Sequence, residues 1–144
     1  SQQRPLPLPL PAPPAIPAPQ PAPRPTGRLS WPTRGVITTY FSGWHPGIDI
    51  AAPLGTSIGA ADAGTVSSAG WSSWGYGYRV VVNHQNGLST TYNHLSVISV
   101  RPGQALGKGQ LVGLMGSTGR STGSHLHFEI LRGGSYVNPL GALS

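Results

Sequence analysis

The run His125-Leu-His-Phe-Glu-Ile-Leu131 decides the fold of this 144-residue chain more than any other stretch. Polar and apolar residues alternate along it, and residues two apart on a strand point to the same face of a sheet. His125 and His127 therefore share one face of a predicted strand. The opposite, core-facing side takes the alternating apolar residues, which are Leu126, Phe128 and Ile130. The two imidazoles either bind a metal ion or a water molecule, or they are simply a pair of exposed histidines on a strand.

The rest of the chain after residue 30 also reads as β-structure. Short runs rich in Val, Ile, Thr and Tyr lie between Gly, Asn and Pro residues, which interrupt strands. No window keeps a period near 3.6, so we expect little helix. The predicted fold is all-β, a twisted antiparallel sheet or barrel-like sandwich whose long loops form a groove. The expected strands are residues 35–39, 48–50, 57–60, 64–69, 78–83, 88–92, 110–115 and 126–131, with a hairpin turn at Asn86-Gly87.

A proline-rich arm precedes this body. Of the 16 prolines, 11 lie between Pro5 and Pro25. Proline fixes φ and removes backbone donors, so the arm should be disordered and extended as polyproline II. We expect residues 1–30 to form a linker and residues 31–144 to form one domain. The arm is either a spacer from an upstream domain or membrane anchor, or a ligand for a proline-binding domain, and its composition favours the spacer.

Charge and composition exclude several function classes. The chain carries nine Lys and Arg residues against three acids, with a net charge of +6, and the basic surplus lies mostly on the arm. No basic cluster is interleaved with aromatic residues, so we expect no nucleic-acid partner. The chain has no cysteine, which excludes thiol catalysis and cysteine-ligated metals. No stretch approaches the ~20 apolar residues of a transmembrane segment.

A second candidate cluster is His45-Pro-Gly-Ile-Asp49. Pro46 and Gly47 argue against a helix, but a turn leading into a strand still lets His45 and Asp49 converge. Asp49 lies between two isoleucines, and a buried carboxylate needs a metal, an arginine or backbone donors as its partner. Two histidines with one carboxylate match a catalytic zinc site, in which the fourth position is open to water. Of the remaining histidines, His94 follows a predicted strand, and His84 lies in a hairpin loop as a bystander.

The two histidine clusters and several short motifs between them, taken in order along the chain, resemble those of the lysostaphin/LytM-type zinc endopeptidases of peptidoglycan. The resemblance covers about residues 35–140. Its blocks are 45–56 (HPGIDIAAPLGT), 63–66 (AGTV), 69–72 (AGWS), 92–96 (YNHLS), 113–119 (GLMGSTG) and 124–129 (SHLHFE). It implies a zinc-dependent peptidoglycan hydrolase that acts outside the cytoplasm, with peptidoglycan as its partner and Zn²⁺ as its cofactor.

The resemblance also implies roles for individual residues. His45, Asp49 and His127 match the metal ligands, and His125 and His94 match the two unligated histidines beside the zinc. His125, with His94, would accept a proton from water and return it to the leaving amine. The resemblance makes Tyr40 the candidate for an oxyanion-stabilising tyrosine.

The residues themselves leave further roles open. Glu129 shares a strand face with His127 and is an alternative general base. The aromatic residues either line a substrate groove or pack on the sheet, and these are Trp71, Trp74, Tyr76 and Tyr78. We interpret residues 116–123 as a groove wall.

Two readings compete with an active enzyme. One is an inactive wall-binding or hydrolase-activating module of the same fold, but such relatives usually lose ligand positions, and here all five positions are filled. The other is a metal- or glycan-binding module, which would not need His94 and His125. The family includes enzymes that cut glycine bridges and enzymes that cut cross-links with D-amino acids, and the residues leave both open.

Overall fold

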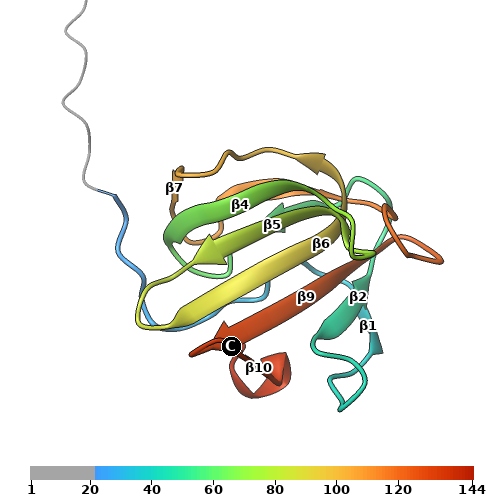
Figure 1. The fold of residues 1–144 in the computed structure, drawn as a ribbon, viewed down its shortest axis with the longest axis horizontal. Coiled ribbons are helices and arrows are strands. Elements are labelled where there is room, and N and C mark those ends of the chain that lie inside the picture. The colour runs from blue at the N-terminus through green and yellow to red at the C-terminus, as the bar shows by residue number, and fades with distance from the viewer. Residues whose placement is uncertain (1–21) are drawn as a thin grey trace, which may run out of the picture.

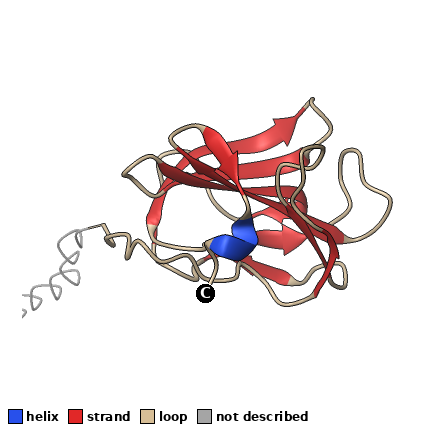
Figure 2. Cartoon of the chain, turned by 90° about the horizontal axis from the view of Figure 1, so that it is seen from below, coloured by secondary structure: helices blue, strands red, loops and turns tan. Residues whose placement is uncertain are grey.

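A computed structural model describes residues 22–144 of the chain, and all ten strands in this part belong to one sheet (Figure 1). The only helical element in residues 22–144 is a single 3-10 turn, Pro139–Gly141, seen near the C-terminus in Figure 2. The strands are β1 Val36–Thr39, β2 Ile48–Ala51, β3 Ser57–Gly59, β4 Gly64–Ser72, β5 Gly77–Asn83, β6 Leu88–Ile98, β7 Ala105–Leu106, β8 Leu111–Met115, β9 His125–Arg132 and β10 Ser135–Val137.

Every pairing in the sheet is antiparallel. The main path runs β1-β2-β9-β6-β5-β4-β7, and β10 pairs with β9, while β8 links β3 to β6. The long strands β4, β5, β6 and β9 lie side by side across the front of Figure 1. The sheet does not close into a barrel. The all-β prediction and the twisted antiparallel sheet are confirmed.

The alternation of residues along β9 and β2 separates the core from the site. In β9 the side chains of Leu126, Phe128 and Ile130 are fully buried in the hydrophobic core. In β2 Ile48 and Ile50 enter the same core, so Asp49 between them points to the other face of the sheet. That outer face carries Asp49 from β2 and His125 and His127 from β9.

The predicted strands all exist, but several extend further than the sequence indicates. The strand expected at residues 88–92 runs to Ile98, and the strand expected at residues 64–69 runs to Ser72. β7 and β10, of two and three residues, were not predicted. The hairpin loop has positive φ at Gln85, Asn86 and Gly87, as the Asn-Gly pair predicts.

The chain joins the folded body before residue 31. The residues 1–21 of the predicted arm lie outside the described part, but residues 26–30 contact the body closely. Asp62 accepts hydrogen bonds from the backbone N–H groups of Thr26 and Gly27 at 3.0 Å, and Leu29 is only 2% exposed. Leu29 also bridges to Leu143 near the C-terminus. The proline-rich composition therefore ends before these contacts begin, and residues 26–30, which we expected in the linker, pack on the body. Within residues 22–144 no helix has the length and apolarity needed to cross a lipid bilayer.

Candidate metal centre and groove

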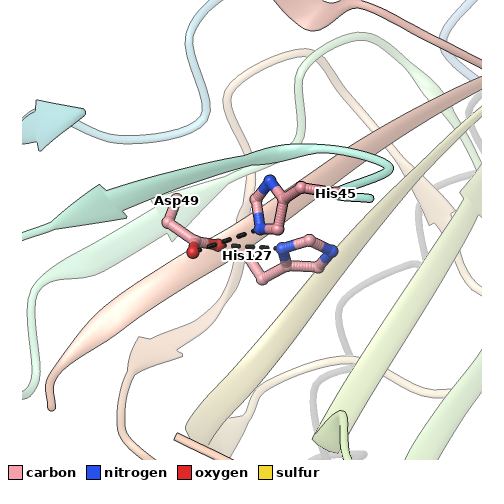
Figure 3. A group of neighbouring side chains, drawn as sticks. All are labelled: His45, Asp49 and His127. Carbon is pink, nitrogen blue, oxygen red and sulfur yellow. Dashed lines mark hydrogen bonds and ion pairs between the residues drawn. The ribbon is translucent and has the colours of Figure 1, made fainter. Parts of the chain in front are cut away.

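Strand register brings Asp49 and His127 together. β2 pairs with β9 so that Asp49 lies directly opposite His127, and the two side chains share the outer face of the sheet. The Asp49 Oδ1 atom lies 2.8 Å from Nδ1 of His127 and 3.7 Å from Nε2 of His125. Figure 3 shows His45, Asp49 and His127 converging on one point. One donor atom from each of these three residues lies within 4.8 Å of the others.

His45 reaches the cluster from the loop that precedes β2. Its Nδ1–H donates to the carbonyl oxygen of Gly47 at 2.8 Å and approaches that of Tyr40 at 3.2 Å. Because Nδ1 carries the proton of the neutral ring, Nε2 presents its lone pair to Asp49 Oδ2, which is 3.2 Å away. Two acceptor atoms this close to each other require a proton or a cation between them.

His127 is held by carboxylates on both sides. Its Nε2 lies 3.1 Å from Oε2 of Glu129, on the opposite side of the ring from Asp49. Burial disfavours the imidazolium, but the hydrogen bonds to Asp49 and Glu129 outweigh burial and raise the pKa of His127 to about 9. With Nε2–H donated to Glu129, Nδ1 is the nitrogen that faces the cluster. A cation that binds there would displace the proton from Nδ1.

Glu129 lies at the centre of a buried hydrogen-bonding network. Its side chain is fully buried and accepts hydrogen bonds from Thr91 Oγ1 at 2.7 Å, Tyr76 Oη at 3.2 Å and Arg79 Nη2 at 3.4 Å. Burial opposes its charge, yet His127 and Thr91 lead the contacts that hold the pKa of Glu129 below its usual range. The structure therefore places Glu129 behind His127, away from water, where it fixes the ring and is unsuited to the alternative role of general base.

His94 enters the site through a β-bulge in β6. Tyr78 and Val80 on β5 pair with Leu95 and Tyr92 on β6, so β6 carries one extra residue in this interval. His94 lies in this bulge with φ of 64°, a left-handed conformation that is uncommon outside glycine. The bulge turns the His94 ring toward His125, and their centroids are 4.7 Å apart.

The two histidines predicted to be unligated have their tautomers fixed by backbone carbonyls. Nδ1 of His94 donates to Thr118 O at 2.7 Å, and Nδ1 of His125 donates to Gly123 O at 2.9 Å. Each neutral ring therefore keeps Nε2 as an acceptor. Burial is the main cause that lowers the pKa of His94, and the neighbouring His125 and His127 lower it further, although the hydrogen bond to Thr118 acts in the opposite direction. The lowered pKa favours the neutral form of His94 near pH 7.

A groove of about 510 Å³ opens over this cluster. Trp44 and Trp74 on its walls are 98% and 88% exposed. Among the aromatic residues left open by the sequence, Trp74 and Tyr76 line the groove, whereas Trp71 and Tyr78 pack edge to face at 5.2 Å outside it. The predicted groove wall at residues 116–123 contributes Arg120, Ser121 and Thr122.

The structure does not place the Tyr40 side chain on the groove. It is 60% exposed, and it touches the cluster through its backbone oxygen, which approaches His45. Tyr76 is the tyrosine that lines the groove instead. Its hydroxyl donates to Glu129, and burial followed by the Glu129 charge raises the pKa of Tyr76 to about 12, so the phenol stays protonated. Alternation along β-strands gives no signal for this contact, because Tyr76 comes from a hairpin turn.

His84 is separate from the site, as predicted. It is buried at 2% exposure, donates from Nδ1 to Ala63 O at 2.8 Å and contacts Thr90 Oγ1 through Nε2 at 2.7 Å. Thr90 Oγ1 in turn lies 2.7 Å from Tyr92 Oη, which accepts the N–H of Ala61 at 2.9 Å. This continuous chain of hydrogen bonds holds the turn at residues 61–63, so His84 has a structural role.

The donor set fits Zn²⁺. Neutral imidazole nitrogen and carboxylate oxygen suit this ion, and catalytic zinc sites use three protein ligands. Here Nε2 of His45 lies 3.2 Å from Oδ2 of Asp49, and Oδ1 of Asp49 lies 2.8 Å from Nδ1 of His127, an acceptor-rich cluster that calls for positive charge. Glu129 supplies the outer carboxylate that ligating histidines usually have behind them.

The chain therefore folds into an open antiparallel sheet, and a His–Asp–His group that could hold a metal ion lies in a groove on its surface. The profile of peptidase family M23 matches residues 43–139, and the chain belongs to this family of metallopeptidases. The resemblance to the lysostaphin/LytM-type family is thereby confirmed.

Three similar proteins indicate what the family does. The chain is 47% identical over 96 residues to the DD-carboxypeptidase/endopeptidase Mpg of Neisseria meningitidis, covering 67% of the chain and 22% of that protein. It is 40% identical over 113 residues to the murein hydrolase activator NlpD of Escherichia coli, covering 76% of the chain and 30% of that protein. A zinc-containing peptidase from Vibrio cholerae superposes with a TM-score of 0.72 at 31% identity, covering 77% of the chain and 39% of that structure. The chain thus spans less than a third of the length of Mpg and of NlpD.

Proposed function

We propose that this domain is a zinc-dependent endopeptidase that hydrolyses peptide bonds in the stem or crossbridge of bacterial peptidoglycan. The observation that carries the proposal is the convergence of His45, Asp49 and His127 within 4.8 Å on the floor of an open groove. The named activity of the Mpg relative on DD-peptide bonds supports the same substrate class. The location outside the cytoplasm follows from that substrate.

The proposed mechanism assigns a task to each group in the groove. A bound Zn²⁺ would polarise the scissile carbonyl and lower the pKa of water. His45, Asp49 and His127 would hold the ion, and Glu129 keeps the His127 ring in the tautomer that turns Nδ1 toward Asp49. The free Nε2 atoms of His94 and His125 accept the proton of the attacking water and return it to the leaving amine.

Once protonated at Nε2, His94 or His125 can donate a hydrogen bond to the oxyanion, whereas the hydroxyl of Tyr76 already donates to Glu129. Tyr76 keeps its proton because its pKa is raised to about 12, and its ring centroid lies 6.0 Å from that of His127. Tyr40 was matched to this role by resemblance, but its exposed side chain does not line the groove. We therefore favour Tyr76 over Tyr40 as the groove tyrosine that contacts substrate.

The second candidate function is activation of another wall hydrolase. The 40% identity to the activator NlpD supports it. An activator needs a docking surface but no catalytic water, so neither the ordered Nε2 atoms of His94 and His125 nor the Glu129 network would be required. The presence of all these groups favours the enzyme.

The decisive experiment is digestion of purified peptidoglycan sacculi by the zinc-loaded chain, with released fragments identified by mass spectrometry. We expect new peptide termini that disappear with a chelator, return with added Zn²⁺ and are absent from His127→Ala. Circular dichroism and zinc content of each variant separate loss of fold from loss of metal. An unreactive but folded and zinc-loaded chain that stimulates an added murein hydrolase would instead support the activator.

A further inference from the structure

Arg120 is a basic side chain on the wall of the catalytic groove. It lies in the loop between β8 and β9, its side chain is exposed, and among the groove-lining residues it is the sole Lys or Arg. Arginine is always charged and binds carboxylates through two parallel hydrogen bonds. Its position beside the His–Asp–His group places this charge next to any substrate held there.

The backbone at Arg120 is fixed although its guanidinium is free. Its N–H donates to the carbonyl of Gly75 in the β4–β5 hairpin at 2.8 Å. Thr118 anchors the same loop, donating to Leu95 O at 2.6 Å and accepting the N–H of Tyr78 at 3.1 Å. A side chain at Gly119 would meet the Gly77 nitrogen at 2.3 Å, so loop and hairpin touch backbone to backbone. Arg120 therefore projects from a rigid wall.

The chain has no side-chain carboxylate left to neutralise Arg120. Its three acids are Asp49, Asp62 and Glu129. Asp49 belongs to the histidine cluster, Asp62 is buried against Thr26 and the turn at residues 61–63, and Glu129 is fully buried behind His127. Within residues 22–144 the Arg120 guanidinium has no ion pair, so its charge is available to a ligand.

Arg79 shows the contrasting case. Its guanidinium pairs with Glu129 at 3.4 Å and packs over the Tyr76 ring at 4.2 Å, so its role is internal. Arg120 makes neither kind of contact within the described residues. The two arginines nearest the site thus divide into a structural one and one that faces the groove.

We propose that Arg120 binds a carboxylate of the peptide substrate and selects acidic peptides over neutral ones. This inference rests on the proposed peptidoglycan substrate and deepens it. Stem peptides carry carboxylates at their free ends and on side chains, whereas a bridge of glycine residues carries none between its ends. Arg120 therefore directs the site toward cross-links between stem peptides rather than toward glycine bridges.

The test measures binding separately from cleavage. The probe is a synthetic stem peptide ending in D-alanine, prepared once with free carboxylates and once fully amidated, and binding is followed by the fluorescence of Trp44 and Trp74 in the groove. Titrations run with zinc and after its removal by a chelator, because a carboxylate that binds the metal would lose its advantage without zinc. The variants are Arg120→Gln, Arg120→Lys and, as a matched loss of exposed charge away from the groove, Arg101→Gln.

We expect the wild type to bind the free acid about tenfold or more tightly than the amide, the effect of one charge-assisted hydrogen bond. Arg120→Gln should lose this ratio, Arg120→Lys should keep part of it and Arg101→Gln should keep all of it. Equal binding of acid and amide by the wild type, or a preference that survives in Arg120→Gln, overturns the proposal. Failure to cleave sacculi would overturn the endopeptidase function alone and leave this binding result standing.

Discussion

Glu129 shows how one buried residue controls a site it does not enter. Among the three proposed metal ligands it contacts only His127, through Nε2, and it also accepts hydrogen bonds from Thr91, Tyr76 and Arg79. Removing its charge would leave the partly buried Arg79 without its ion-pair partner and free the His127 ring to rotate or change tautomer. The loss of Glu129 should therefore affect metal affinity more directly than it affects the hydrolytic step.

We predict that Glu129→Gln lowers zinc affinity by about 10- to 100-fold, the usual cost of losing a carboxylate behind a metal-binding histidine. Competition with a chelating dye measures this directly. Thr91→Val removes one hydrogen bond to the same carboxylate without changing its charge, and should cause a smaller loss. Unchanged zinc affinity in Glu129→Gln would show that the ring of His127 is oriented by other contacts.

The bulge in β6 brings His94 to the site, whereas the rest of this strand pairs with its neighbours in the sheet. His94 has φ of 64°, and its N–H donates to Tyr76 O in the neighbouring hairpin. Asparagine tolerates this left-handed conformation, whereas a β-branched residue there is a steric outlier. The bulge should therefore be more sensitive to side-chain shape than to side-chain chemistry.

Guanidinium denaturation of two variants tests this. Both His94→Asn and His94→Val remove the proton acceptor and should lose peptidoglycan hydrolysis. We expect His94→Val to be less stable than His94→Asn by about 1–2 kcal/mol, the cost of a left-handed conformation for a hindered residue. Equal stability of the two variants would mean that the bulge relaxes when His94 is replaced.

Strand alternation also explains which elements the sequence could predict. The run at 125–131 alternates so regularly that its strand, its core face and its histidine face all follow from the residues. Asp49 and His127 could be paired only through the resemblance, because register between strands 78 residues apart has no local signal. The bulge at His94, the partners of Glu129 and the contacts of residues 26–30 depend on such distant pairings and were not foreseen.

At the scale of the whole molecule, the hydrogen-bond chain through His84 makes folding stability depend on pH. Burial is the main cause that holds the pKa of His84 below 6.5, against the opposing influence of Ala63 and Asp62. The unfolded chain therefore takes up a proton at a higher pH than the folded chain. The stabilisation is fully present above the unfolded pKa and is lost as the pH falls through the lower, folded pKa.

We accordingly expect the free energy of unfolding to decrease as the pH drops below about 6.5, the ordinary pKa of histidine. Denaturation curves across this range, compared with His84→Gln, isolate the contribution. Glutamine can hydrogen-bond to the same partners but does not titrate here, so the slope of the variant should be shallower at acid pH. Parallel pH profiles for the two proteins would assign the acid sensitivity to other groups.

The division between strands and turns has a further consequence. The atoms proposed for chemistry come largely from paired strands, where register fixes them, while Trp44, Trp74 and Arg120 project from connecting segments. Such segments tolerate exchange far better than the sheet beneath them. Design or evolution could therefore exchange the walls of the groove while the His–Asp–His centre stays unchanged. Altering three short connecting segments would then change which peptide the groove binds.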